Sequence, residues 1–328
     1  MDPALREALA GMPRLGFGGA VIGNLYREVD DAAARAAVDA AWENGLRHYD
    51  TAPHYGLGLS ERRLGEALRD RPRNEFVLST KVGRLLRPRV PAVARDDEGF
   101  AVPGDIGRVR DYSGDGVRRS IEESLQRLGL DRIDIAYIHD PDEYWEDALR
   151  GAVPALEKLR DEGVIGAWGA GMNQAEMLTR FARETDIDVI MCAGRYSLLD
   201  QHADRELLPA AAERGIAVMA VGVFNSGILA KPRPPATATY NYEQAPVELL
   251  QRANELAELA ESHGTTLPAV AVHFALRHPA VTHIHLGMRT PDQVMSSVSL
   301  VREEVPEAFY ADAVAAGLLA PPNPAPPG

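Results

Sequence analysis

Four polar side chains follow short apolar runs, in an order that would bring them together. Asp50 and Lys81 each end such a run, and Tyr55 lies in the loop just after Asp50. His139 follows a third run. If the three runs are neighbouring strands of one parallel sheet, the four side chains meet at its carboxyl edge. Open α/β sheets and barrels carry their chemistry at that edge.

These residue types suit proton transfer at an oxygen atom. A phenol is a weak acid, with an ordinary pKa of about 10. The ammonium of Lys81 beside Tyr55 would favour the phenolate, and Asp50 would hold that lysine charged. His139 could hydrogen-bond a substrate carbonyl or hydroxyl from the other side. None of the four can carry a hydride, so the set implies a nicotinamide cofactor.

Each of these residues also has a plain structural interpretation. Asp50 could form a turn or cap a helix, and Tyr55 could be an aromatic residue at a rim. His139 and the two aspartates that follow it could form a simple turn or a metal site. Lys81 is harder to explain in this way, because lysine is rarely buried without a partner. The position of all four at predicted strand ends favours the functional interpretation.

Short apolar runs alternate with longer amphipathic segments along the chain. The runs lack in-and-out alternation, as expected of parallel strands that are buried on both faces. We predict strands at Leu15–Ala20, Arg47–Asp50, Phe76–Lys81, Ile133–Ile138, Ala167–Ala170, Val189–Cys192, Ala217–Val221 and Thr282–Leu286. We predict helices at Asp31–Asn44, Ser60–Leu68, Val117–Leu128, Trp145–Glu162, Ala203–Arg214, Val247–His263 and Pro291–Leu300. Eight such repeats favour an α/β fold, a closed (β/α)8 TIM barrel that forms one domain over residues 1–328, with its core from about 15 to about 300.

Two segments break the repeat. Residues 85–112 are long and charged and follow the third predicted strand, and residues 224–246 are rich in Pro, Ala, Thr and Tyr and follow the seventh. Loops longer than about 12–15 residues are usually functional lids or disordered. Because both segments leave from the carboxyl ends of strands, we predict that they are lids over the site. The Pro-rich end, residues 320–328, is predicted to be a flexible tail.

The composition narrows the classes of partner. A net charge of −13 would repel both the phosphate backbone of nucleic acids and an anionic membrane surface. The one cysteine, Cys192, excludes an internal disulfide, which is typical of a reducing cytoplasm. The first residues lack a secretory signal, and no apolar run approaches the roughly 20 residues that span a bilayer. We therefore expect a cytoplasmic protein that acts on a small molecule, with no nucleic-acid or membrane partner and no signal for an oligomeric state.

No metal site is predicted from the histidines. Four of them lie close together in the sequence, at positions 273, 278, 283 and 285. No pair has the i, i+4 spacing beside a glutamate that zinc proteases use. We interpret most of these histidines as packing or capping residues.

Several motifs around the four polar residues resemble those of the aldo-keto reductases. They are Asp50-Thr51-Ala52, Tyr55-Gly56, Ser60-Glu61, Ser79-Thr80-Lys81 and His139. The resemblance extends from Leu15 to about Leu300 and implies a (β/α)8 barrel that works with NAD or NADP. It also implies that Tyr55 is the general acid/base, tuned by Lys81 and Asp50. In the same way, His139 would orient the oxygen atom of the substrate.

Further motifs are similar to those of the D-threo-aldose 1-dehydrogenases (L-fucose and L-galactose dehydrogenases) and of pyridoxal 4-dehydrogenase. They are Gly16-Phe17-Gly18-Gly19-Ala20, Ile22-Gly23-Asn24-Leu25-Tyr26, Asp111-Tyr112-Ser113-Gly114-Asp115-Gly116, His139-Asp140-Pro141-Asp142 and Gly171-Met172-Asn173-Gln174. The resemblance implies oxidation of the C1 hydroxyl of an aldose, of the L-fucose, L-galactose or D-arabinose type, to a lactone. The alternatives are a pyridoxal 4-dehydrogenase, a general aldehyde or ketone reductase, and a nicotinamide-binding regulatory subunit without significant turnover. A pocket lined with hydrogen-bonding groups would favour a sugar, and an aromatic slot would favour pyridoxal.

The same resemblance indicates the cofactor residues. Asn173 is the candidate for holding the nicotinamide amide, with a helix N-cap as its structural alternative. The family segment that holds the adenosine phosphate is matched here by Gly287, Met288, Arg289 and Gln293. Backbone N–H groups at such a strand-to-helix turn can bind phosphate. NADP-selective relatives carry Lys and Arg where this chain has Gly287 and Gln293. This leaves Arg289 as the candidate cation for a 2′-phosphate. Its structural alternative is a solvent-facing residue at the start of a helix. The pattern therefore favours NAD over NADP.

Overall fold

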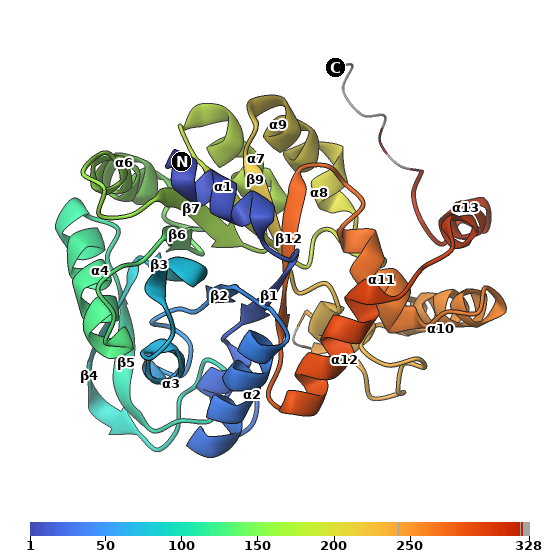
Figure 1. The fold of residues 1–328 in the computed structure, drawn as a ribbon, viewed down its shortest axis with the longest axis horizontal. Helices are drawn as coiled ribbons and strands as arrows, with labels where there is room; N and C mark the ends of the chain where they lie inside the picture. The colour runs from blue at the N-terminus through green and yellow to red at the C-terminus, as the bar shows by residue number, and fades with distance from the viewer. Residues whose placement is uncertain (242, 322, 324–328) are drawn as a thin grey trace.

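The centre of the protein is a closed barrel of eight parallel strands (Figure 1). The structure is a computed structural model that describes residues 1–241, 243–321 and 323. Going round the barrel, the strands are β1 (Leu15–Gly18), β2 (His48–Asp50), β3 (Val77–Val82), β6 (Ile135–His139), β7 (Ala167–Met172), β8 (Val189–Ala193), β9 (Ala217–Val221) and β12 (Val281–Gly287). β12 pairs with β1 and closes the ring, with Leu15 beside Ile284. The predicted (β/α)8 fold is confirmed, and each predicted strand is present.

Helices cover the outside of the barrel (Figure 1). They are α2 (Asp31–Glu43), α3 (Leu59–Leu68), α4 (Gly114–Leu128), α5 (Trp145–Asp147), α6 (Val153–Asp161), α7 (Ala175–Glu184), α8 (His202–Arg205), α9 (Leu207–Arg214), α11 (Leu267–Ala275) and α12 (Pro291–Arg302). In α4 the buried Val117, Ile121 and Leu128 share one face, which packs on the strands. Neither α7 nor α11 is among the predicted helices. Most residues of α11 are buried, so it lacks the amphipathic pattern that marks the others. No helix of the described ranges is long and apolar enough to cross a membrane.

A helix at the start of the chain, α1 (Pro3–Gly11), closes the amino end of the barrel. Its buried Leu5 and Leu9 pack with interior residues of the strands, which are Val77, Ile135, Tyr137, Ala167, Val189, Met191 and Met219. Asp2 caps the helix, because its carboxylate accepts hydrogen bonds from the first backbone N–H groups. No helix is predicted here from the sequence, although an Asp followed by Pro is a typical helix start.

Both long segments leave from the carboxyl ends of strands, as predicted, but neither is a plain loop. The first forms an antiparallel hairpin after β3, made of β4 (Arg84–Val93) and β5 (Gly104–Arg110). The second contains a 3₁₀ turn (Asn225–Gly227) and the short paired strands β10 (Thr239–Tyr240) and β11 (Glu243–Gln244). Beside the barrel, α10 (Val247–Ser262), α11 and α13 (Glu307–Ala315) share a second apolar cluster (Figure 1). Of the predicted tail 320–328, residues 322 and 324–328 lie outside the described residues.

The interior of the barrel has an apolar side and a histidine side. Alternate residues of each strand point inward, and those packed on α1 are apolar. The other side is formed by His48 of β2 and by His283 and His285 of β12, each at most 4% exposed. The ring of His48 lies edge to face with both others. Gly16 of β1 provides the space, because a Cβ there would lie 2.4 Å from the imidazole of His285.

We expect the free energy of unfolding to fall as the pH drops below about 6.5, the pKa of an unfolded histidine. Burial lowers the pKa of His283 to about 4 and that of His285 to about 3. Above the unfolded pKa these histidines are unprotonated in both the folded and the unfolded state, so the free energy of unfolding keeps its full value there. Below it the unfolded chain binds protons that the folded chain does not bind, so each such histidine destabilises the fold by about 2 kcal/mol at pH 5.

This expectation is checked by measuring Tm from about pH 7.5 to about pH 5. His283→Leu should flatten the pH dependence of Tm relative to the unmodified protein. His202→Gln is the matched control, because the side chain of His202 is 53% exposed. Equal slopes for the unmodified protein and His283→Leu would contradict the assignment.

Candidate active site

A buried ion pair lies at the carboxyl end of the barrel. Lys81 of β3 places its Nζ 2.7 and 2.9 Å from the carboxylate oxygens of Asp50, which ends the neighbouring β2. The ammonium also donates to the carbonyl of Thr51 at 2.9 Å, and Ser79 Oγ donates to Asp50 Oδ1 at 2.7 Å. Burial alone would lower the pKa of Lys81, but Asp50 and Tyr55 outweigh it and raise that pKa. The lysine is therefore charged although it is only 2% exposed.

Tyr55 lies in a tight loop beside this ion pair. Gly56 follows it with a φ of 62°, a conformation that glycine adopts without strain. A Cβ on Gly56 would lie 2.2 Å from the carbonyl oxygen of Gly23, so the loop rests directly on that backbone. The loop holds the ring of Tyr55 with its centroid 4.7 Å from Lys81 Nζ. Burial raises the pKa of Tyr55 to about 12, and the positive charge of Lys81 opposes that rise.

His139 ends β6 and faces Tyr55. The two ring centroids are 5.8 Å apart and the ring planes are nearly perpendicular, at 89°. Its Nε2 lies 3.5 Å from Asp140 Oδ2, and its buried Nδ1 has no hydrogen-bond partner in the described ranges. Burial, with Arg84 adding to it, lowers the pKa of His139 well below its usual value. The neutral ring therefore has one donor and one acceptor nitrogen. The structure thus brings together all four residues predicted from the sequence.

A cavity of about 770 Å³ opens above these four residues, which all line it. Its cofactor-side half, as we call it, is formed by the ends of β1, β7, β8, β9 and β12. Its hairpin-side half is formed by the β4–β5 hairpin and by the loops after β2 and β6. The hairpin-side half carries residues that the sequence analysis does not assign to the site, namely His54, Arg84, Glu98, Phe100 and Asp140.

A charged network lines the hairpin-side half. Arg84 Nη2 donates to Asp140 Oδ2 at 2.5 Å, and its Nη1 lies 3.7 Å from Glu98 Oε2. The side chains of Glu98 and Asp140 are 47% and 32% exposed, so their carboxylates can accept further hydrogen bonds. Arg84 Nε and His54 Nδ1 are buried and have no hydrogen-bond partner in the part of the chain that the structure describes. This half therefore offers both donors and acceptors to a ligand.

The tip of the β4–β5 hairpin brings Glu98 and Phe100 to the cavity. The tip is fixed by Asp96, which is buried and pairs with Arg108 of β5 at 2.5 Å. Phe100 also forms a backbone bridge with Leu25 on the opposite side of the mouth. Its ring centroid lies 5.0 Å from that of His54, edge to face. The only sequence signal for Glu98 and Phe100 is that they lie in a long charged segment. Their contacts join distant parts of the chain, so no local pattern predicts them.

The cofactor-side half has a floor of small residues at the strand ends, which are Gly18, Gly171, Ala193, Val221, Gly222 and Gly287. These small residues leave this part of the cavity open beside Tyr55. Asn173 lines this half and is exposed. It is not the N-cap of α7, which is Gln174, so the helix-cap alternative for Asn173 is wrong.

The predicted phosphate segment lies at the start of α12. Thr290 caps this helix by accepting a hydrogen bond from the N–H of Gln293. Gln293 Oε1 accepts one from the N–H of Arg289 at 2.8 Å, and Arg289 Nη2 donates to the carbonyl of Leu25 at 2.9 Å. The side chain of Met288 is fully buried in the apolar core. A helix N-terminus beside a trough of small residues fits the phosphate and nicotinamide ends of a dinucleotide.

The described ranges contain no group of three or more His, Cys, Asp or Glu that is placed to hold a metal ion. The four histidines that lie close in sequence are spread over different environments. His273 Nε2 lies 3.0 Å from the carbonyl oxygen of Leu300, and His278 Nδ1 accepts from the N–H of Ala280 at 3.1 Å. His283 and His285 lie inside the barrel.

Comparisons with known proteins agree with this geometry. Residues 14–316 match the sequence model of the Aldo/keto reductase family. A D-threo-aldose 1-dehydrogenase of a Pseudomonas species is 47% identical, over 97% of this chain and 98% of that protein. A pyridoxal 4-dehydrogenase of Microbacterium luteolum is 39% identical, over 93% of this chain and 94% of that protein. An L-galactose dehydrogenase of Arabidopsis thaliana is 29% identical, over 88% and 84%.

Two solved structures share the fold. A glycerol dehydrogenase of Gluconobacter oxydans has a TM-score of 0.75 and 26% identity, and the match covers 97% of this chain and 96% of that chain. An aldo-keto reductase of Bacillus halodurans in its holo form has a TM-score of 0.72 and 27% identity, over 93% and 92%. Aldo-keto reductases use NAD(P)H as the hydride carrier. This chain belongs to the aldo/keto reductase family and is an NAD(P)-dependent oxidoreductase.

Proposed function

We propose that the protein oxidises the C1 hydroxyl of an aldose of the L-fucose, L-galactose or D-arabinose type, giving a lactone. The observation that carries this proposal is the charged lining of the hairpin-side half. Arg84 supplies a buried donor nitrogen, and the neutral ring of His54 supplies a buried nitrogen without a hydrogen-bond partner in the described ranges. Glu98 and Asp140 supply partly exposed carboxylates. Several hydroxyls on one ring would use both kinds of group at once, because each hydroxyl both donates and accepts.

In this mechanism Tyr55 is the general base for oxidation and the general acid for the reverse reaction. The charge of Lys81 favours the phenolate, and Asp50 keeps that charge beside the ring. His139 donates a hydrogen bond to the substrate oxygen and holds it near the phenol. The nicotinamide, when bound, supplies the hydride chemistry at C1. Asp50, Tyr55, Lys81 and His139 are thus the proposed catalytic set.

For the cofactor, we propose that Asn173 binds the nicotinamide amide. The turn from Gly287 to Gln293 would bind the adenosine phosphate through backbone N–H groups other than those of Arg289 and Gln293, which already donate to Gln293 Oε1 and to Thr290. Met288 would contribute through its backbone, because its side chain lies in the core. Arg289 is the candidate cation for a 2′-phosphate; burial lowers its pKa, and Arg27 is close enough to lower that pKa further. Because this chain has Gly287 and Gln293 where NADP-selective relatives carry Lys and Arg, we favour NAD over NADP.

A second candidate is oxidation of pyridoxal at its 4-position. Its support is the 39% identity with a pyridoxal 4-dehydrogenase and the aromatic ring of Phe100, which lies beside Tyr55 with the ring centroids 6.0 Å apart. A pyridine ring could stack on Phe100. The charged groups around Phe100 favour a sugar over pyridoxal as the substrate.

The function is tested by following nicotinamide absorbance with NAD or NADP and one of L-fucose, L-galactose, D-arabinose or pyridoxal. We expect rapid reduction of the cofactor with at least one sugar. Activity with pyridoxal alone would favour the second candidate. Bound cofactor without turnover of any substrate would favour a regulatory binding protein and contradict the dehydrogenase.

Tyr55→Phe should lower kcat for sugar oxidation by at least about a hundredfold, because the ring then has no acid or base group. Its affinity for the cofactor, measured by nicotinamide fluorescence, should stay within about twofold, since the packing of the ring is kept. Tyr196→Phe is the control, because it removes the hydroxyl of a buried tyrosine that does not line this cavity. A Tyr55→Phe enzyme with substantial turnover would refute the proton-transfer role.

Arg289→Ala should raise the KM for NADP by about tenfold or more and change that for NAD much less. The physical reason is the loss of the one charge proposed to face the 2′-phosphate. The two KM values are measured with the same sugar. Equal effects on both cofactors would contradict a phosphate role for Arg289.

A further inference from the structure

Three histidines form a column through the barrel, between two cavities. His285 of β12 lines the active-site cavity, and His283 of the same strand lines a second cavity at the amino end. His48 of β2 lies between them. Its ring centroid is 4.3 Å from that of His285 and 5.5 Å from that of His283. The column therefore connects the two ends of the barrel.

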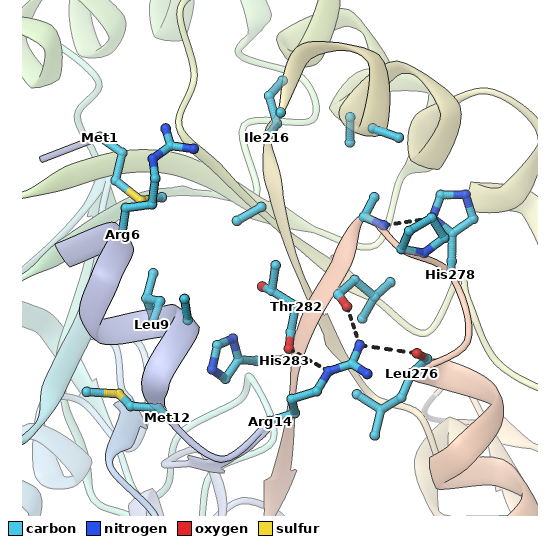
Figure 2. A pocket seen from close by; sticks show the side chains of 18 of the residues that line it. Met1, Arg6, Leu9, Met12, Arg14, Ile216, Leu276, His278, Thr282 and His283 are labelled. Atoms are coloured by element: carbon cyan, nitrogen blue, oxygen red, sulfur yellow. Dashed lines mark hydrogen bonds between the residues drawn. The ribbon is translucent and has the colours of Figure 1, made fainter. Parts of the chain in front are cut away.

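The second cavity, which we call the lower cavity, lies between α1 and the amino end of β12 and has a volume of about 670 Å³. Figure 2 shows His283 between α1 and β12, on the same side as Leu9 and Met12. Exposed lining residues such as Arg6 and Pro279 open this cavity to solvent. The guanidinium of Arg14, also in this cavity, is occupied by three backbone carbonyls. The lower cavity is thus a solvent-facing space beneath His283.

The ring nitrogens of the column have no hydrogen-bond partner in the part of the chain that the structure describes. Both nitrogens of His48, His283 and His285 are buried, and none forms a hydrogen bond within residues 1–241, 243–321 and 323. Buried polar atoms are normally hydrogen-bonded, and internal water is the usual partner when protein groups are absent. Because burial keeps these rings neutral, each carries one donor and one acceptor nitrogen.

Other titratable groups face the column at both ends. Lys81 is near enough to His285 to lower its pKa further, and Arg14 does the same to His283. The buried hydroxyl of Tyr137, across the interior, has no hydrogen-bond partner in the described ranges and is close enough to Asp50 for that charge to raise its pKa. The rest of the interior beside α1 is apolar. The polar route between the two cavities therefore runs along the histidines.

Oxidation of an alcohol leaves one proton to be removed in each turnover. The substrate O–H bond breaks and the phenol O–H bond of Tyr55 forms. The electron pair of the C1–H bond leaves with the hydride, and C1 and its oxygen form a double bond. Tyr55 must then lose its proton before it can act again. A substrate and a cofactor bound in the cavity that Tyr55 lines would lie between its hydroxyl and solvent at this stage.

We propose that His285, His48 and His283, with internal water at the ring nitrogens, carry this proton from Tyr55 and Lys81 to the lower cavity. Each neutral imidazole takes a proton on one nitrogen and releases one from the other, so the column returns to its starting state when the rings reorient. In the reductive direction the column delivers a proton to Tyr55. The inference rests on the proposed dehydrogenase function.

The first test follows proton release by the unmodified enzyme. Enzyme, NAD and L-fucose are mixed rapidly in weak buffer with a pH indicator, and sucrose is added because viscosity slows product release. We expect the proton to reach the solvent in the same kinetic phase as reduced nicotinamide, before the lactone leaves. Release of the proton together with the product would overturn the proposal, because the proton would then leave through the mouth of the active site.

Variants locate the path. His48→Leu removes the central imidazole with little change in volume, and Met219→Leu is the matched control on the apolar side of the same interior. We expect kcat to fall at least about tenfold in His48→Leu and to recover when imidazole is added. In Met219→Leu we expect kcat to stay at the value of the unmodified enzyme. His283 lies next to the lower cavity, and His283→Leu should show the same loss of kcat as His48→Leu. This variant replaces His48→Leu in the test if His48→Leu does not fold.

Unchanged kcat in folded His48→Leu and His283→Leu, or an equal loss in Met219→Leu, would show that the column merely packs the barrel. The same variants are measured with D-glyceraldehyde and NADH, where each turnover takes up a proton. An enzyme that reduces this aldehyde but oxidises no sugar would refute the proposed function, and the variants would still decide the proposal for the column.

Discussion

The site depends on the buried ion pair between Asp50 and Lys81. A charge in this position without its partner would destabilise the fold by about 3–5 kcal/mol, so neither residue tolerates the loss of the other. Thr51 and Ser79 complete the hydrogen bonds of the pair. Because the two charges come from adjacent strands, they meet when β2 and β3 pair in register. The same charge that stabilises this register also acts on the ring of Tyr55.

The division of the barrel interior follows from what each strand places inside it. Strands packed on α1 contribute apolar residues, which α1 seals from solvent. β2 and β12 contribute imidazoles, and β1 between them contributes Gly16, which has no side chain to block their contact. A polar interior is tolerated because neutral histidines cost less to bury than charges. The fold thereby keeps a polar route between its two ends.

Chemistry and recognition come from different parts of the structure. The proposed proton-transfer groups sit at strand ends and in the short loop after β2, which the barrel holds rigidly. The groups that face the hairpin-side half come from the β4–β5 hairpin, from the turn after β6 and, in the case of His54, from the loop after β2. Their positions depend on ion pairs such as Arg84 with Asp140 and Arg108 with Asp96. Changes in the hairpin can therefore alter the ligand that is bound without disturbing Asp50 and Lys81.

The sequence by itself determined the order of the strands, the barrel and the convergence of Asp50, Tyr55, Lys81 and His139. These follow from local patterns, because a short apolar run and the polar residue at its end are visible in one window of the chain. Only the tertiary structure decided the lining by Glu98 and Phe100, the ordered hairpin and the contact of His48 with His285. Those features depend on contacts between residues far apart in the chain, which leave no periodic signal in the sequence.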